Sequence, residues 1–117
     1  MTTIAPDILI EIVRRVVAIA EPDKIIMFGS AARGTMGPHS DVDLLVIKSG
    51  VYDHGKLSDH VHMGLNGVRQ PTGIIIATPE TIERYKDSFA LVYYPALREG
   101  RVVYEAARRP AALKETG

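Results

Sequence analysis

The chain of 117 residues contains no cysteine, so it can form neither a disulfide nor a thiolate metal site. This absence is typical of a cytoplasmic protein, the location that we expect, because disulfides persist mainly in oxidising compartments. No basic region followed by an apolar stretch and a small-residue cleavage site is present, so no signal peptide is predicted. No apolar run approaches the roughly 20 residues that span a bilayer, and no membrane contact is expected.

An excess of charge of either sign is also absent, since 14 basic residues balance 14 acidic ones. A dedicated nucleic-acid-binding domain usually has a basic excess, so direct nucleic-acid binding is not expected. A nucleotide held through a metal ion stays compatible with this balance. The length fits one domain with its own hydrophobic core, and the chain has no repeat or low-complexity segment.

The spacing of apolar residues predicts helices that alternate with short strands. This order predicts an α/β (α+β) domain in which helices flank a mixed β-sheet. We expect the domain to span residues 1–105 and a flexible C-terminal tail to span residues 106–117. The helices are expected over residues 6–20, 30–33, 53–66, from 79 onward and over 88–98, and the strands over 24–28, 42–48, 73–77 and 102–104.

The run from Phe89 to Leu97 is more apolar than one face of a helix requires. A core helix would explain most of it. Tyr93 or Tyr94 exposed at an interface with a second copy or a partner would explain it equally well, because tyrosine is favoured at interfaces. Homo-oligomerisation therefore stays open.

Residues 29–43 contain the side chains that indicate chemistry. Gly29 and Ser30 end the first predicted strand, and Asp41 and Asp43 begin the second. Residues i and i+2 of a strand lie on the same face, about 7 Å apart, so the two carboxylates repel each other unless a cation lies between them. Mg²⁺ prefers such oxygen ligands and usually binds together with substrate phosphates, which a Gly-Ser turn at a helix start can accept.

This motif, Gly-Ser followed after ten residues by Asp-x-Asp, resembles the signature of the nucleotidyltransferase superfamily with the DNA polymerase β palm-like fold. The chain is most similar to the minimal nucleotidyltransferases (MNT), the antitoxin partners of HEPN-type toxins. The resemblance covers nearly the whole chain, through Phe28–Gly34, Ser40–Val46, Ala77–Glu80 and Ala96–Glu105. It implies a nucleotidyltransferase fold with a mixed sheet.

The resemblance also implies a role for each residue of the motif. Asp41 and Asp43 would be the catalytic and metal-binding carboxylates, holding Mg²⁺ and through it the triphosphate of ATP. Gly29 and Ser30 would contact the phosphates, and Arg33 would neutralise a phosphate or the pyrophosphate leaving group. The alternative, in which Asp41 caps a turn and Asp43 is an exposed carboxylate, requires several independent features to coincide by chance.

The chain departs from this family at one position. Active members carry a third carboxylate on a later strand, and here Gly73 stands where that aspartate is expected. A shifted alignment, with Asp59 or Glu80 reaching the site, is the other explanation, and Glu80 is the better substitute of the two. Since the third carboxylate helps to activate the attacking hydroxyl, its absence predicts slow transfer.

Two functions of different classes follow. The first is an enzyme that transfers AMP from ATP to a protein hydroxyl, which the resemblance indicates is a tyrosine of a HEPN-type toxin. The second is a catalytically weak or inactive antitoxin that neutralises its toxin by contact. The intact Gly29, Ser30, Asp41 and Asp43 favour the enzyme, whereas Gly73 favours the binding module.

Overall fold

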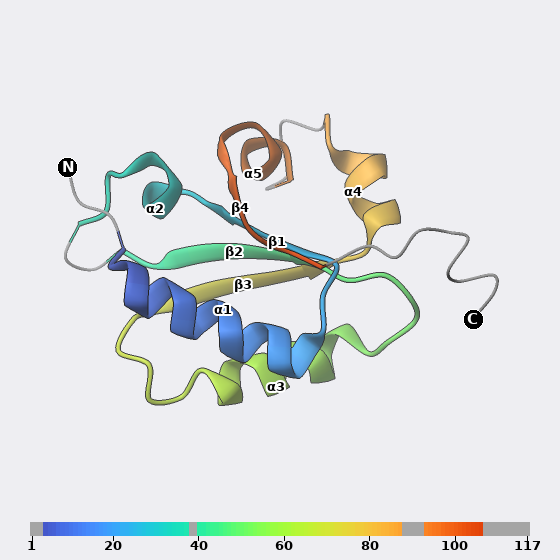
Figure 1. The fold of residues 1–117 in the computed structure, drawn as a ribbon. Helices are drawn as coiled ribbons and strands as arrows, with labels where there is room; N and C mark the ends of the chain where they lie inside the picture. The colour runs from blue at the N-terminus through green and yellow to red at the C-terminus, as the bar shows by residue number, and fades with distance from the viewer. Residues whose placement is uncertain (1–3, 38–39, 88–92, 107–117) are drawn as a thin grey trace.

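The computed structural model describes residues 4–37, 40–87 and 93–106, and it contains one four-stranded sheet with helices on both faces (Figure 1). The strands lie in the order β3-β2-β1-β4. Strand β1 is antiparallel to β2 and β4, whereas β2 and β3 are parallel, so the predicted mixed sheet is confirmed. The elements are α1 (Pro6–Ala20), β1 (Lys24–Phe28), α2 (Ser30–Arg33), β2 (Val42–Ile47), α3 (His54–Gly64), β3 (Thr72–Ala77), α4 (Pro79–Tyr85), α5 (Tyr93–Glu99) and β4 (Arg101–Glu105).

Strands β1, β2 and β3 contribute to two cores because alternate side chains of a strand point to opposite faces of the sheet. The larger core lies between the sheet and the pair α1 and α3, and it contains Ile12, Ile25 and Leu44. The smaller core lies on the face of α4 and α5, and it contains Phe28 and Leu45. Figure 1 shows the two pairs of helices on opposite sides of the sheet. The parity of β2 therefore places Asp43, two residues before Leu45, on the face of α4 and α5.

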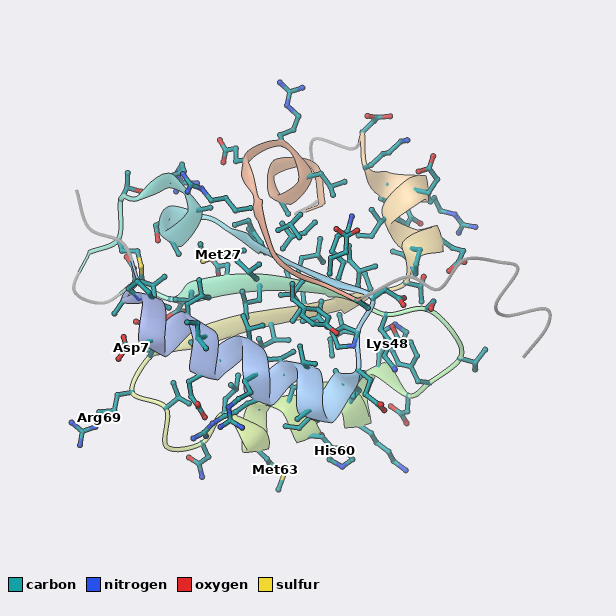
Figure 2. All side chains as sticks on the ribbon, viewed as in Figure 1. Asp7, Met27, Lys48, His60, Met63 and Arg69 are labelled. Carbon is teal, nitrogen blue, oxygen red and sulfur yellow. The ribbon has the colours of Figure 1, made fainter. Side chains whose placement is uncertain are left out.

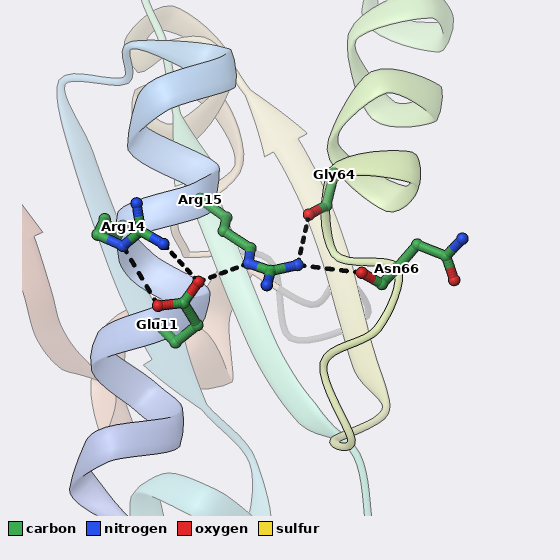
Figure 3. A network of polar contacts seen from close by, with 5 residues as sticks. All are labelled: Glu11, Arg14, Arg15, Gly64 and Asn66. Atoms are coloured by element: carbon green, nitrogen blue, oxygen red, sulfur yellow. Dashed lines mark hydrogen bonds and ion pairs between the residues drawn. The ribbon is translucent and has the colours of Figure 1, made fainter.

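Helix α1 extends over the residues predicted for it, and it packs closely against α3. A side chain at Gly64 would collide with the Cδ1 atom of Ile19, so this glycine inside the predicted helix permits the close contact of the two helices. Arg15 of α1 donates hydrogen bonds to the carbonyl oxygens of Gly64 and Asn66 at 3.1 and 3.0 Å (Figure 3). The guanidinium satisfies carbonyls that the end of a helix leaves without partners.

The ends of several elements differ slightly from the prediction. Helix α3 ends at Gly64 rather than at residue 66, because Leu65 is its C-cap. The outer face of α3 is polar apart from Met63; Figure 2 shows His60 and Met63 pointing away from the sheet. Among the described residues, no helix is long and apolar enough to cross a membrane.

Two predictions fall outside the described residues. The first is the start of the predicted helix 88–98, of which the structure describes only α5. The side chains of Tyr93 and Tyr94, on which the interface hypothesis rests, also lie outside the described part. The predicted flexible tail from residue 106 also lies beyond the described range, except for Ala106, whose N–H donates to the Asp23 carbonyl at 2.9 Å.

Candidate functional site

The candidate site forms where β1 ends and β2 begins, because the antiparallel register places Phe28 directly opposite Asp43. Gly29 and Ser30 follow β1 at this end of the sheet, and Asp41 immediately precedes β2. Asp43 is half-buried and Asp41 is exposed. The structure thus brings the Gly-Ser turn and the Asp-x-Asp pair to the same end of the two central strands.

The Asp43 carboxylate lies between two glycines. A Cβ atom added at Gly29 would be 2.5 Å from Asp43 Oδ2, and one added at Gly73 would be 2.8 Å from Asp43 Oδ1. Gly29 also has φ 71° and ψ −152°, a conformation that essentially only glycine adopts. Any other residue at position 29 would therefore strain the backbone and displace the carboxylate.

The pKa of Asp43 is raised above its ordinary value, first because the carboxylate is partly buried and second because Asp41 adds a nearby negative charge. Arg33 opposes this shift, and its charge lowers the pKa. The two carboxylates are thus close enough to repel each other, as the strand spacing predicted. A cation between them would relieve both the burial penalty and the repulsion.

Ser30 is the first residue of α2, and its carbonyl accepts the N–H groups of Gly34 and Thr35, the latter at 2.9 Å. Within the described part of the chain, its hydroxyl makes no hydrogen bond. Its side chain is half-buried and it follows the glycine that touches Asp43. The serine hydroxyl therefore keeps its hydrogen-bonding capacity for a ligand at the Asp43 end of the sheet.

Arg33 is the last residue of α2, and its Nη1 atom lies 3.3 Å from Oε2 of Glu99, the last residue of α5. Both side chains are about half exposed. The sequence did not indicate Glu99, because the two residues are 66 positions apart and no local pattern relates them.

Gln70 is a second residue that sequence reasoning missed. Its side-chain amide donates to the carbonyl oxygens of Ser40 and Pro71, each at 3.1 Å. The Val42 N–H donates to the same Pro71 carbonyl at 2.9 Å. Gln70 thereby links Ser40, which precedes Asp41, to Pro71, which precedes β3. This link restrains the backbone on the N-terminal side of Asp41.

The parallel register of β2 and β3 pairs Asp43 with Gly73. The structure therefore places Gly73 beside Asp43, where the resemblance expects the third carboxylate. Glu80 lies in α4, beyond the opposite end of β3. It is near Tyr52, whose pKa is raised first by burial, then by the charge of Asp23 and last by that of Glu80, and whose hydroxyl donates to the Lys48 carbonyl past the end of β2. Asp59 is exposed on α3, on the other face of the sheet. Neither residue is positioned to replace the missing carboxylate.

The donor set at this end of the sheet suits an ion that takes only part of its coordination from the protein. Among the described residues, no group of three or more histidine, aspartate or glutamate side chains could hold a metal ion. Mg²⁺ is commonly bound by one or two carboxylates together with substrate phosphates and water. The pair Asp41 and Asp43 fits that arrangement.

The sheet order, the Gly-Ser turn and the Asp-x-Asp pair agree with a nucleotidyl-transfer type of domain. The nucleotidyltransferase domain family matches residues 7–97, which is most of the chain. The chain therefore belongs to the nucleotidyltransferase domain family, and the family predicted from the sequence is confirmed. No curated protein matches the sequence.

Solved structures share the fold at low sequence identity. A protein from Sulfolobus solfataricus assigned as a nucleotidyltransferase is 20% identical, with a TM-score of 0.58, and the alignment covers 85% of this chain and 78% of that one. A mutant of the MntA–HpeT toxin–antitoxin is 15% identical, with a TM-score of 0.58 and coverage of 89% and 75%. A toxin–antitoxin with AMP-PNP is 15% identical, with a TM-score of 0.53 and coverage of 81% and 72%.

Proposed function

We propose that this protein is a minimal nucleotidyltransferase that acts in the cytoplasm as an antitoxin, transferring AMP from ATP to a protein hydroxyl of a HEPN-type toxin, with tyrosine as the expected acceptor. Residues 1–105 would form the transferase domain. The observation that carries the proposal is the half-buried Asp43 carboxylate, coupled to Asp41 and held against the Gly-Ser turn. The fold shared with toxin–antitoxin structures, one of them with AMP-PNP, supports the partner and the nucleotide.

In the proposed reaction the acceptor hydroxyl oxygen attacks the α-phosphorus of ATP. A new oxygen–phosphorus bond forms, the bond from the α-phosphorus to the bridging oxygen breaks, and pyrophosphate leaves. Asp41 and Asp43 would hold Mg²⁺, which supplies charge stabilisation for the transferring phosphoryl group. The Ser30 hydroxyl and Gly29 would contact the phosphates, and Arg33 would balance the charge of the leaving group.

The strand position paired with Asp43 is Gly73, so the described part of the chain offers no third carboxylate there to accept the hydroxyl proton. The proton would pass to water, and we expect transfer to be slow. This same observation supports the second candidate function, an antitoxin that binds Mg²⁺ and ATP but neutralises its toxin by contact alone.

The test of the nucleotide site is calorimetric titration of ATP with and without Mg²⁺, for the wild type and for Asp43→Asn. The wild type should bind ATP more tightly with Mg²⁺, and Asp43→Asn should bind it equally with and without the ion. Asp59→Asn is the matched control, because Asp59 is exposed on the opposite face of the sheet and should leave the Mg²⁺ response intact. A wild type that ignores Mg²⁺, or a variant that still responds to it, would contradict the assignment.

Radioactive ATP distinguishes AMP transfer to the toxin from neutralisation by contact alone, according to which phosphate carries the label. With a HEPN-type toxin as acceptor, label in the α-phosphate of ATP should remain on the toxin after denaturation, whereas label in the γ-phosphate should not. Toxin that is neutralised without retaining either label would show that contact alone is sufficient.

A further inference from the structure

The ion pair between Arg33 and Glu99 links two helices that lie far apart in the sequence. Arg33 ends α2, next to the Gly-Ser turn, and Glu99 ends α5, which packs on the same sheet face as Asp43. Their closest atoms are 3.3 Å apart. Among the residues that the structure describes, Glu99 is the only side chain that pairs with Arg33.

Arg33 also lies next to the candidate site, because it ends the short helix α2 that begins at Ser30, and Gly29 before this helix lies against the Asp43 carboxylate. Its guanidinium is thus paired with Glu99, while its charge also reaches Asp43, whose pKa is raised by burial and by Asp41 and lowered by Arg33. A triphosphate bound through Mg²⁺ at Asp41 and Asp43 would bring further negative charge into the range of the same guanidinium.

The contact with Glu99 is weak enough to be exchanged. The two side chains are 48% and 49% exposed, and the distance of 3.3 Å exceeds the 2.7–2.9 Å that is usual for a charge-assisted hydrogen bond. Exposed ion pairs of this kind contribute little to stability. Glu99 accepts a single hydrogen bond from Arg33, whereas a phosphate can accept two parallel hydrogen bonds from one guanidinium, so it can replace this carboxylate favourably.

We infer that Glu99 is a positioning residue that competes with the phosphates of the nucleotide for Arg33, and so keeps the affinity of the site for ATP low. The inference rests on the proposed function, because it assumes that the triphosphate binds at Asp41 and Asp43. It assigns Glu99 a role that is distinct from metal binding and from catalysis.

The test is the dissociation constant of Mg²⁺–ATP for Glu99→Gln, measured by calorimetry at low ionic strength. Removing the competing charge should tighten binding about two- to fivefold, the range expected from the strength of an exposed ion pair. Glu105→Gln is the matched control. Glu105 is 52% exposed and pairs with Lys24 at 3.6 Å, at the end of β1 away from Gly29. This control changes the net charge equally, but Glu105 lies at the other end of β1 from the site and does not contact Arg33, so it should tighten binding less.

A second pair of variants shows whether the effect acts through Arg33. In an Arg33→Ala background, Glu99→Gln should no longer tighten binding, because the shared guanidinium is gone. Thermal unfolding of each variant, measured alongside, should show small changes, since a merely structural role of Glu99 would lower stability without raising affinity.

Each outcome separates this inference from the proposed function. Unchanged or weaker binding in Glu99→Gln, or a gain in affinity that persists without Arg33, would refute the competition for Arg33. The proposed function would still stand as long as the wild type binds Mg²⁺–ATP. A wild type that does not bind Mg²⁺–ATP would overturn both.

Discussion

Replacing Gly73 with aspartate tests whether the site lacks only one carboxylate. The register places residue 73 beside Asp43, and a Cβ atom there would lie 2.8 Å from Asp43 Oδ1. The carboxylate of Asp43 must therefore shift, which costs little because the contacted oxygen is the end of a side chain. The φ of Gly73 does not lie in the left-handed region, so an aspartate fits the backbone.

The expected change in the stability of Gly73→Asp follows from charge repulsion rather than from packing. Like charges directly opposite each other on neighbouring strands cost up to about 1 kcal/mol, and partial burial increases this cost. Without Mg²⁺, Gly73→Asp should thus melt about 4–8 °C below Gly73→Asn, which has the same shape without the charge. With Mg²⁺ the difference should shrink or reverse, because the ion binds the folded three-carboxylate site and stabilises it.

The same variant should accelerate transfer. A carboxylate that accepts the hydroxyl proton typically contributes ~10²- to 10⁴-fold to the rate, so incorporation of labelled AMP into the toxin should rise by a factor in this range. The reasoning is refuted if Gly73→Asp and Gly73→Asn respond equally to Mg²⁺, or if the wild type is already fast and Gly73→Asp slows it. Such results would mean that another group serves as the third ligand or base.

Two further predictions concern single side chains of the site. Ser30→Ala should weaken ATP binding by about 1 kcal/mol, close to fivefold. The melting temperature should change little, because the Ser30 hydroxyl has no other partner among the described residues. A large loss of stability with unchanged ATP affinity would show that the serine has a structural role instead. Asp43→Asn should raise the unfolding free energy near pH 7. The raised pKa of Asp43 means that the ionised carboxylate destabilises the fold above that pKa. The advantage of the variant in urea unfolding should shrink as the pH falls through the folded-state pKa towards the unfolded value near 4, and an advantage that grows on acidification would contradict the assigned shift.

The sequence alone determined the features that depend on neighbouring residues. Apolar periodicity gave the helix over Pro6–Ala20 and the strand over Lys24–Phe28 with the bounds that the structure has. The motif from Gly29 to Asp43 was recognisable because a strand, a tight turn and a second strand follow one another within 20 residues. The repulsion between Asp41 and Asp43 follows from their spacing of two residues at the start of a strand.

The tertiary structure decided the contacts between distant segments. The parallel pairing of β2 with β3 places Gly73 beside Asp43 and moves Glu80 to the other end of the sheet, which settles the alignment that the sequence left open. The same holds for the contact of Gln70 with Ser40, 30 positions apart, and for the pairing of Arg33 with Glu99. Local periodicity specifies which face of an element is apolar, but strand order and register arise only when all the elements pack together, so these partners follow from the assembled fold alone.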